Sequence, residues 1–158
     1  SPDLVAVGKA LGGGVPVGAA LLNEKEASAI FAGDHGSTYG GNLLACRAAL
    51  VFLDALTTGG LMERVGQVGA ALEAGLRRLA ERHDVIREVR GAGLMWGLDL
   101  KVDATPYIGA ALADGILINR TSETVIRMLP PYVLSKAQAE DVVRRLDAVF
   151  AHVAQEAA

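Results

Sequence analysis

The segment from Leu4 to Leu22 most constrains what this chain can fold into, because it is apolar and yet too often interrupted to form one helix. It holds a single charged residue, Lys9, together with five glycines and Pro16. A lysine at the centre of a membrane span costs roughly 2.5–3.5 kcal/mol on insertion scales, and glycine with proline interrupts helices. The segment therefore predicts strands joined by a glycine turn in a soluble protein, without a signal peptide or a membrane partner.

The composition allows a folded core and argues against nucleic-acid binding. Of 158 residues, 51% are hydrophobic, which is enough to bury a core. The formal net charge is −3 and charges of both signs are interspersed, so no basic face for nucleic acid is expected. Cys46 is the only cysteine, which excludes an intrachain disulfide and a cysteine-rich metal site. We expect no metal and a reducing, cytoplasmic location.

The first part of the chain, residues 1–57, predicts a strand, a loop and a helix. Leu4–Val7 is a continuous apolar run before a glycine, a pattern typical of a strand buried on both faces, as in a parallel sheet. A second strand is expected within Val15–Leu22, after a turn of three glycines. The other expected elements are a short helix at 24–31, a polar glycine-rich loop at 33–42 and an apolar helix at 43–56.

The second part, residues 58–158, predicts a small α+β domain that begins near the segment Thr57–Gly60. Apolar residues first recur at steps of three and four, which is typical of a helix with one buried stripe. These residues are Leu61, Val65, Val68, Leu72, Leu76 and Leu79. Ser135 with Gln138 forms a capping box that opens a last helix. Between these helices we expect strands at 85–89, 94–100, 116–118 and 125–129, and a helix at 107–114.

Lys9 is the most informative residue for chemistry. It follows an apolar strand, precedes three glycines and is the only charge between Asp3 and Glu24. An ammonium is costly to bury, whereas a desolvated lysine can act as a neutral, nucleophilic amine toward an aldehyde such as pyridoxal phosphate. The alternative is a lysine that extends from a strand end into solvent. A Walker A lysine is excluded, because its glycines precede the lysine and a Ser or Thr follows it.

Two further motifs point to anion binding, and each has a structural alternative. The segment 35–42, His-Gly-Ser-Thr-Tyr-Gly-Gly-Asn, places hydroxyls and backbone N–H groups before a helix, where they suit a phosphate or carboxylate. The alternative is a surface loop that ends in an N-cap at Asn42. Arg127 lies within the apolar segment Val125–Leu129, where a bidentate anion would compensate a buried guanidinium. The alternative is an arginine that simply faces solvent.

Together, these motifs resemble the carboxy-terminal part of class III aminotransferases, and most closely the acetylornithine/ornithine branch. Residues 2–18 resemble the segment of the cofactor lysine, and residues 35–42 resemble the phosphate loop. Residues 88–95 resemble a strand and turn of the small domain, and residues 125–131 resemble the final arginine strand. The resemblance covers essentially the whole chain. It implies an α/β fold, the carboxy-terminal portion of a fold-type I transferase that uses pyridoxal 5'-phosphate (PLP), with a remnant of the large-domain sheet and a small α+β domain.

The resemblance also implies a role for each motif residue. Lys9 would form the covalent link to PLP and, once substrate displaces it, move a proton between substrate and cofactor. Thr38 would hydrogen-bond the cofactor phosphate across the interface of a homodimer whose subunits share the active site. Ser37 would contact substrate, and Arg127 would hold a carboxylate of the substrate or of 2-oxoglutarate.

The sequence departs from the family pattern in two visible places. Leu43 stands where the family usually has proline, and Gly8 replaces a more typical serine or alanine. No position matches the family's phosphate-binding glycine loop, the aromatic ring that stacks on the cofactor or the aspartate that pairs with the pyridinium nitrogen. Since the chain also begins at Ser1 without an initiator methionine, we expect a piece of a longer enzyme, with little or no activity in isolation.

The expected reaction is amino transfer between an N-acetylornithine-like donor and 2-oxoglutarate, in arginine and ornithine metabolism. One alternative is another class III transaminase of ω-amino acids. A second alternative, of a different kind, is a non-catalytic fragment or dimerisation module.

Overall fold

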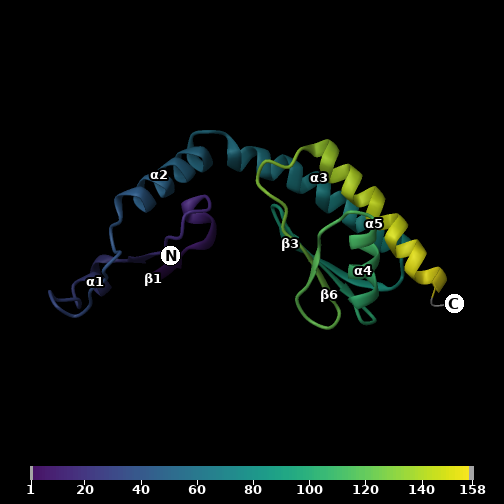
Figure 1. The fold of residues 1–158 in the computed structure, drawn as a ribbon, viewed down its shortest axis with the longest axis horizontal. Coiled ribbons are helices and arrows are strands. Elements are labelled where there is room, and N and C mark those ends of the chain that lie inside the picture. Colours follow the sequence, from purple (N-terminus) through teal and green to yellow (C-terminus); the bar gives the residue numbers. More distant parts are fainter. Residues whose placement is uncertain (1, 157–158) are drawn as a thin grey trace. The chain divides into compact units, whose positions relative to one another are not determined.

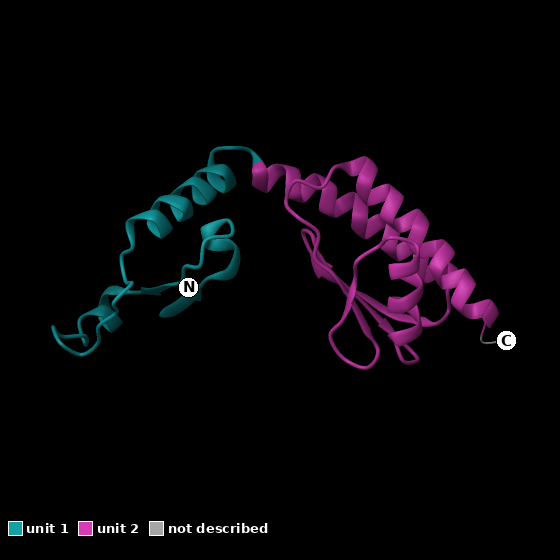
Figure 2. Cartoon of the chain, in the orientation of Figure 1, with its two compact units in different colours: residues 1–60 teal, residues 61–158 magenta. Residues whose placement is uncertain are grey.

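The computed structural model describes residues 2–156, and these residues divide into two compact units. The first unit comprises residues 1–60 and the second comprises residues 61–158, coloured separately in Figure 2. Each unit has its own sheet and its own helices (Figure 1), so each is described by itself.

The first unit is built on a two-stranded antiparallel sheet. Its strands are β1 (Leu4–Val7) and β2 (Ala19–Leu22), paired so that Leu4 lies opposite Leu22 and Val7 opposite Ala19. The connection contains the short 3-10 helix η1 (Lys9–Gly12) and a turn in which Gly13 adopts φ +58°. The remaining elements are α1 (Glu24–Ala27) and α2 (Leu43–Thr57). The expectation of a parallel sheet is therefore wrong for the described strands, because a short connection brings β2 back alongside β1.

The expectation that Leu4–Val7 is buried on both faces is also wrong. Leu4 is 61% exposed and Val7 is 37% exposed, and only Val5 is half-buried. The reason is that, among the described residues, β2 is the only strand beside β1, and α2 contacts the adjoining helix η1 rather than covering the strand.

The second unit is a four-stranded antiparallel sheet with helices on one face. Its strands are β3 (Ile86–Ala92), β4 (Met95–Leu100), β5 (Asn119–Arg120) and β6 (Val125–Met128), in the order β3-β4-β6-β5. Its helices are α3 (Leu61–Arg82), α4 (Thr105–Ala113) and α5 (Lys136–Glu156). Helices α3 and α5 lie side by side across the sheet, and α4 packs against α5 (Figure 1).

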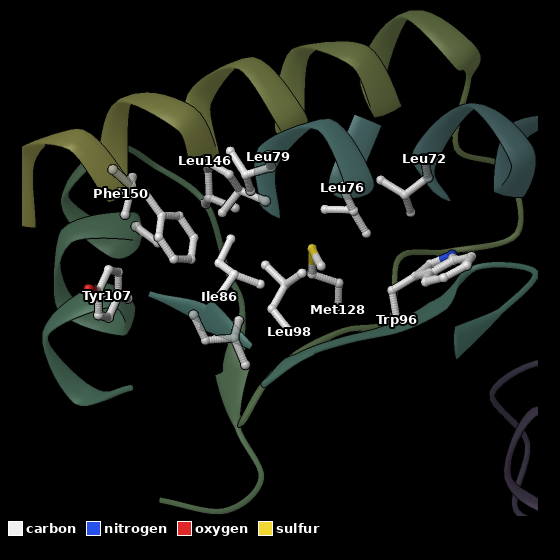
Figure 3. Close-up of a cluster of buried hydrophobic side chains, with 14 of the residues drawn as sticks. Leu72, Leu76, Leu79, Ile86, Trp96, Leu98, Tyr107, Met128, Leu146 and Phe150 are labelled. Atoms are coloured by element: carbon white, nitrogen blue, oxygen red, sulfur yellow. The ribbon is translucent and has the colours of Figure 1, made fainter. Parts of the chain in front are cut away.

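The core of the second unit lies between the sheet and these helices. Leu76 of α3, Leu98 of β4, Ile126 of β6 and Leu146 of α5 are each 0% exposed, and Figure 3 shows Leu76, Leu98 and Leu146 pointing into this layer. Burying each such side chain stabilises the unit by about 1.5–3 kcal/mol. The alternation along β4 and β6 sends the intervening residues to the opposite face, which no helix of the unit covers.

Helices α3 and α5 form as the sequence predicts. The residues expected on the buried stripe of α3 are buried from Val68 onward, and the two before it, Leu61 and Val65, are half-buried. At the start of α5 the backbone N–H of Gln138 donates to Ser135 Oγ at 3.2 Å, and the backbone N–H of Ser135 donates to Gln138 Oε1 at 2.9 Å. The predicted capping box is confirmed.

One expected strand is absent. Residues 116–118 form no regular element, and the strand at this edge is the short β5, which begins at Asn119. Ile116 instead turns inward and is buried, with its backbone N–H donating to the carbonyl oxygen of Ala111 at 2.8 Å. Burial therefore accounts for Ile116 alone, since Leu117 is 87% exposed.

Helix α3 approaches the turn between β3 and β4 so closely that one position excludes a side chain. A Cβ atom at Gly69 would lie 2.4 Å from the carbonyl oxygen of Gly93. At Gly66, one turn earlier on the same helix, a Cβ atom would meet nothing within 4 Å. Glycine is therefore required at the first position and not at the second.

Within residues 2–156, no single helix is long and apolar enough to cross a membrane, although the bent pair of α2 and α3 meets that test of length and composition when taken together.

Candidate functional site

Lys9 occupies a strained backbone position at the point where β1 ends. It is the first residue of η1 and has φ +52°, the one positive φ of a non-glycine residue in the described chain. A left-handed conformation costs a residue with a side chain roughly 1–2 kcal/mol. Strain of this kind persists where the surrounding structure imposes it, and it clusters at functional sites.

The amine of Lys9 is exposed and unpaired. It makes no hydrogen bond or ion pair with another described residue, whereas each other lysine has a carboxylate partner. These pairs are Lys25 with Glu26 at 3.5 Å, Lys101 with Asp84 at 2.8 Å and Lys136 with Glu140 at 3.9 Å. The sequence-based expectation of a buried amine is wrong for this chain, because β1 itself is exposed. Lys9 nevertheless has a free amine without a counter-ion among the described residues.

The loop that carries Ser37 and Thr38 ends in a capped helix. Asn42 accepts a hydrogen bond from the backbone N–H of Ala45 at 3.0 Å, so the N-cap predicted as the structural alternative is present at the start of α2. The backbone carbonyl of Ser37 accepts from Gly40 at 3.3 Å. The hydroxyls of Ser37 and Thr38 make no hydrogen bond to another described residue and are exposed. Both hydroxyls are therefore free to bind an anion.

A hollow of about 1080 Å³ lies within the first unit, between the strands and α2. Its wall includes Val7, Leu11, Val17, Ser37 and Leu50, so it is mostly apolar with a hydroxyl at one side. Ser37 thus lines the same hollow as Val7 and Leu11, which lie two residues before and after Lys9. Lys9 and Thr38 themselves do not line this hollow in the described structure.

Arg127 lies in the second unit, on the face of the sheet that the helices leave open. Its neighbours Ile126 and Met128 are buried, and Arg127 is exposed, as the structural alternative predicts. Its Nε donates to Asn119 Oδ1 at 3.3 Å, and it has no ion pair with another described residue. A guanidinium has five N–H donors, so the bond to Asn119 leaves donors that could bind an anion.

Sequence reasoning missed a second arginine on the same face. Arg90 of β3 and Arg127 of β6 both lie directly opposite Gly97 of β4. Arg90 Nη1 donates to Glu88 Oε2 at 2.6 Å and approaches Asp99 Oδ2 at 3.5 Å, and the hydrogen bond to Glu88 raises the pKa of Arg90. Glu88 and Arg90 are charged and the intervening Val89 is apolar, an alternation that indicates a strand with one exposed face. The pairing of Arg90 with Gly97 depends on strand register and could not be inferred from the sequence.

The donor groups of this chain fit PLP. A free lysine amine suits its aldehyde, and unpaired hydroxyls beside the start of a helix suit its phosphate. A guanidinium without a counter-ion suits a substrate carboxylate.

Comparison with known proteins identifies the family. The family model described as "Aminotransferase class-III" matches residues 1–150. Acetylornithine aminotransferase of Methanocaldococcus jannaschii is 41% identical over 152 residues, 96% of this chain and 38% of the relative. That of Gloeobacter violaceus is 44% identical over 155 residues, again covering 96% of this chain and 38% of the relative. The chain therefore spans well under half the length of the relatives it matches.

Solved structures agree with the sequence relatives. The acetylornithine aminotransferase of Elizabethkingia anophelis matches 96% of this chain and 39% of its own, with TM-score 0.88 and 34% identity. The ornithine aminotransferase of Toxoplasma gondii ME49 matches 98% of this chain and 38% of its own, with TM-score 0.90 and 32% identity. The expected fold, the carboxy-terminal portion of a PLP transferase, is confirmed. The chain belongs to the class-III aminotransferases, a family of PLP-dependent enzymes.

Proposed function

We propose that this chain is the part of a longer aminotransferase that carries the cofactor lysine and one substrate arginine. The complete enzyme transfers an amino group between an N-acetylornithine-like donor and 2-oxoglutarate, as a cytoplasmic homodimer that shares its active sites. The naming of the relatives as acetylornithine aminotransferases supports this choice of donor. Residues 1–57 then correspond to the large PLP-binding domain and the interdomain helix, and residues 58–158 to the small domain.

The observation that carries the proposal is the state of Lys9. It is the one lysine of the described chain without a carboxylate partner, and it sits in a strained conformation between a strand and a glycine turn. A surface lysine with only a solubilising role needs neither property. A lysine held for covalent chemistry benefits from both, since a counter-ion would favour the charged, non-nucleophilic amine.

Four residues of this chain have separate roles in the proposed reaction. PLP, when bound, supplies an electron sink for cleavage at the carbon that bears the amino group. Lys9 holds the cofactor covalently at rest, and its freed amine moves the proton during transfer. Thr38 donates its hydroxyl to the cofactor phosphate of the partner subunit, and Ser37 lies beside the substrate. Arg127 orients a substrate carboxylate with its fork of N–H donors.

A second candidate is a class III transaminase that acts on another ω-amino acid. The similarity to ornithine aminotransferases of known structure favours it, since one of them matches this chain with TM-score 0.90. A product assay with N-acetylornithine and with ornithine as donors separates the two candidates.

A third candidate is a non-catalytic module that associates through apolar surface. Helix α2 favours it, because several of its large apolar side chains are exposed. These are Leu43 at 86%, Leu44 at 71%, Leu50 at 53%, Val51 at 54% and Leu53 at 41%. A module of this kind would dimerise without taking up PLP.

The test of the proposed function is the visible absorbance of the lysine-bound cofactor in the complete enzyme. Lys9→Ala is expected to abolish the absorbance, because the variant removes the amine to which the proposal assigns the cofactor. Lys25→Ala is the matched control, since Lys25 is exposed and paired with Glu26, and it is expected to keep the absorbance. Full absorbance in Lys9→Ala contradicts the assignment of Lys9.

A further inference from the structure

The hairpin of β1 and β2 has Lys9 beyond one end and two polar residues, Asp3 and Asn23, at the other. Leu4 pairs with Leu22, so Asp3 and Asn23 are the next residues opposite each other in the same register. The backbone N–H of Asn23 donates to the Asp3 carbonyl oxygen at 3.1 Å, and Asn23 Nδ2 donates to Asp3 Oδ1 at 2.6 Å. Together these two hydrogen bonds form the Asp3–Asn23 clamp across the open end of the hairpin.

The strands alone do not specify their register. Every paired residue of β1 and β2 is Leu, Val or Ala, so a shifted pairing would still place one aliphatic side chain opposite another. Most of these side chains are exposed, so no buried face opposes a shift, and an isolated two-stranded sheet is only marginally stable. The connection between the strands contains the turn at Gly13 and Gly14 and can adjust. Within the hairpin, the polar pair therefore distinguishes the observed register from its neighbours.

Both ends of the Asn23 side chain are engaged. Its Oδ1 accepts from the backbone N–H of Glu26 at 2.9 Å, which makes Asn23 the N-cap of α1, and its Nδ2 is left to donate to Asp3. A hydrogen bond with an ionised acceptor is stronger than one between neutral groups. The clamp therefore joins β1 to the first turn of α1 as well as to β2.

A change at the clamp is transmitted to Lys9 through the strand. A residue in an antiparallel strand rises about 3.4 Å, so a register shift of one residue moves the backbone at Lys9 by about that distance. A misplacement of about 1 Å can cost roughly 100-fold in catalysis. Gly8, directly before Lys9, still lies beside the returning chain, since a Cβ atom there would be 3.7 Å from the Val17 carbonyl oxygen. The strand register thus determines where the strained turn at Lys9 begins.

We infer that Asp3 is a positioning residue for Lys9. Through Asn23 it fixes the register of β1 against β2 and so the place at which the lysine amine meets the cofactor. The inference rests on the proposed function, in which Lys9 holds PLP and moves the proton. Asp3 acts on this geometry and takes no part in the chemistry, so its acceptor oxygen is required and its charge is not.

The experiment uses two substitutions and their combination in the complete enzyme. Asn23→Asp keeps the N-cap of α1, because both residue types cap well, but it places a second carboxylate against Asp3. Asp3→Asn keeps an acceptor oxygen for Asn23 Nδ2. The double variant exchanges the two side chains and again places an amide opposite a carboxylate. Hydrogen exchange in β1 is measured without PLP, and the absorbance then follows the rate at which added PLP attaches to Lys9.

Asn23→Asp is expected to speed exchange in β1 and to slow PLP attachment, each by about tenfold, since a hydrogen bond to a charged group is lost. With PLP bound, kcat should fall about tenfold while KM for 2-oxoglutarate is unchanged. Asp3→Asn and the double variant are expected to behave as wild type. Wild-type behaviour of Asn23→Asp, or a double variant as impaired as Asn23→Asp, overturns the inference. Faster exchange with unchanged attachment and kcat also overturns it, because the clamp would then only stabilise the strand.

Lys9→Ala separates this inference from the proposed function. Absorbance that persists in Lys9→Ala defeats the cofactor assignment, whereas the exchange measurement is made without PLP and still reports on the clamp. Absorbance lost in Lys9→Ala, together with wild-type behaviour of Asn23→Asp, defeats the role of Asp3 alone.

Discussion

Arg90 and Arg127 face each other across Gly97 on the open side of the sheet, and only Arg90 has carboxylates beside it. The strand register creates this arrangement, since residues directly opposite on neighbouring strands project to the same face. The helices cover the other face, so the charges are placed where a ligand can reach them. Substitutions at Arg90 and Arg127 therefore leave the hydrophobic core untouched.

In the complete enzyme, Arg127→Gln is expected to raise KM for the dicarboxylate substrate about tenfold or more, because a charge-assisted, bidentate contact is lost. The cofactor absorbance should remain, since Lys9 is in the other unit. The measurement is steady-state kinetics with varied 2-oxoglutarate. Arg120→Gln is the neighbouring control, because Arg120 is engaged by Asp103 at 3.1 Å and Thr105 at 3.0 Å. Equal KM values for wild type and Arg127→Gln would return Arg127 to a structural role.

Gly69→Ala is expected to destabilise the second unit by about 1–3 kcal/mol, because its Cβ atom would collide with the Gly93 carbonyl oxygen and force the helix from the turn. Gly66→Ala is the matched control on the same helix. Its Cβ atom has free space, so it should stabilise the unit by about 0.5–1 kcal/mol through helix propensity. The free energy of unfolding in urea measures both. The same effect from both substitutions would contradict the close approach of α3.

The hydrogen bond from Thr124 Oγ1 to Asp99 Oδ1, 2.7 Å long, makes stability depend on acid pH. This bond is the main cause that holds the pKa of Asp99 below its ordinary value of 3.8. A lowered folded-state pKa stabilises the fold above the unfolded-state value, and the contribution is lost as the pH falls through the folded-state pKa.

Thr124→Val should therefore lower the free energy of unfolding by about 1 kcal/mol at pH 7, and by less at pH 3. Urea unfolding at the two pH values measures the difference. Thr121→Val serves as the control, because the hydroxyl of Thr121 makes no hydrogen bond to another described residue. A loss in Thr124→Val that is equally large at both pH values would argue against the ionised Asp99 as the acceptor.

The sequence was sufficient to predict those elements whose structure is determined by local patterns. The three- and four-residue spacing of α3 and the capping box at Ser135 each depend on residues within a few turns, and both are present. The sequence was insufficient where burial depends on distant partners. Leu4–Val7 forms a strand because of its composition, but whether it is buried depends on neighbours that the pattern does not contain.

The residues of the candidate site also differ in how far the sequence predicted them. The strand end, the glycine turn and the loop before α2 locate Lys9, Ser37 and Thr38, because each lies next to a recognisable local signal. The position of Arg90 beside Arg127 was overlooked, since it depends on the strand register that places both opposite Gly97. The exposure of Lys9 was misjudged for the reason that applies to its strand: apolar neighbours in sequence do not cover a side chain unless the fold brings another layer over it.

The most direct test of the central claim traps the cofactor on this chain and asks which lysine holds it. The chain is mixed with limiting PLP, reduced with borohydride and digested, and peptide mapping compares the pyridoxyl group on the four lysine-containing peptides. The account predicts that Lys9 carries most of the lysine label, because it is the one lysine of the described chain in a strained backbone position and without a carboxylate within 4 Å. Label spread evenly over the four lysines, or concentrated on one of the paired three, would contradict it.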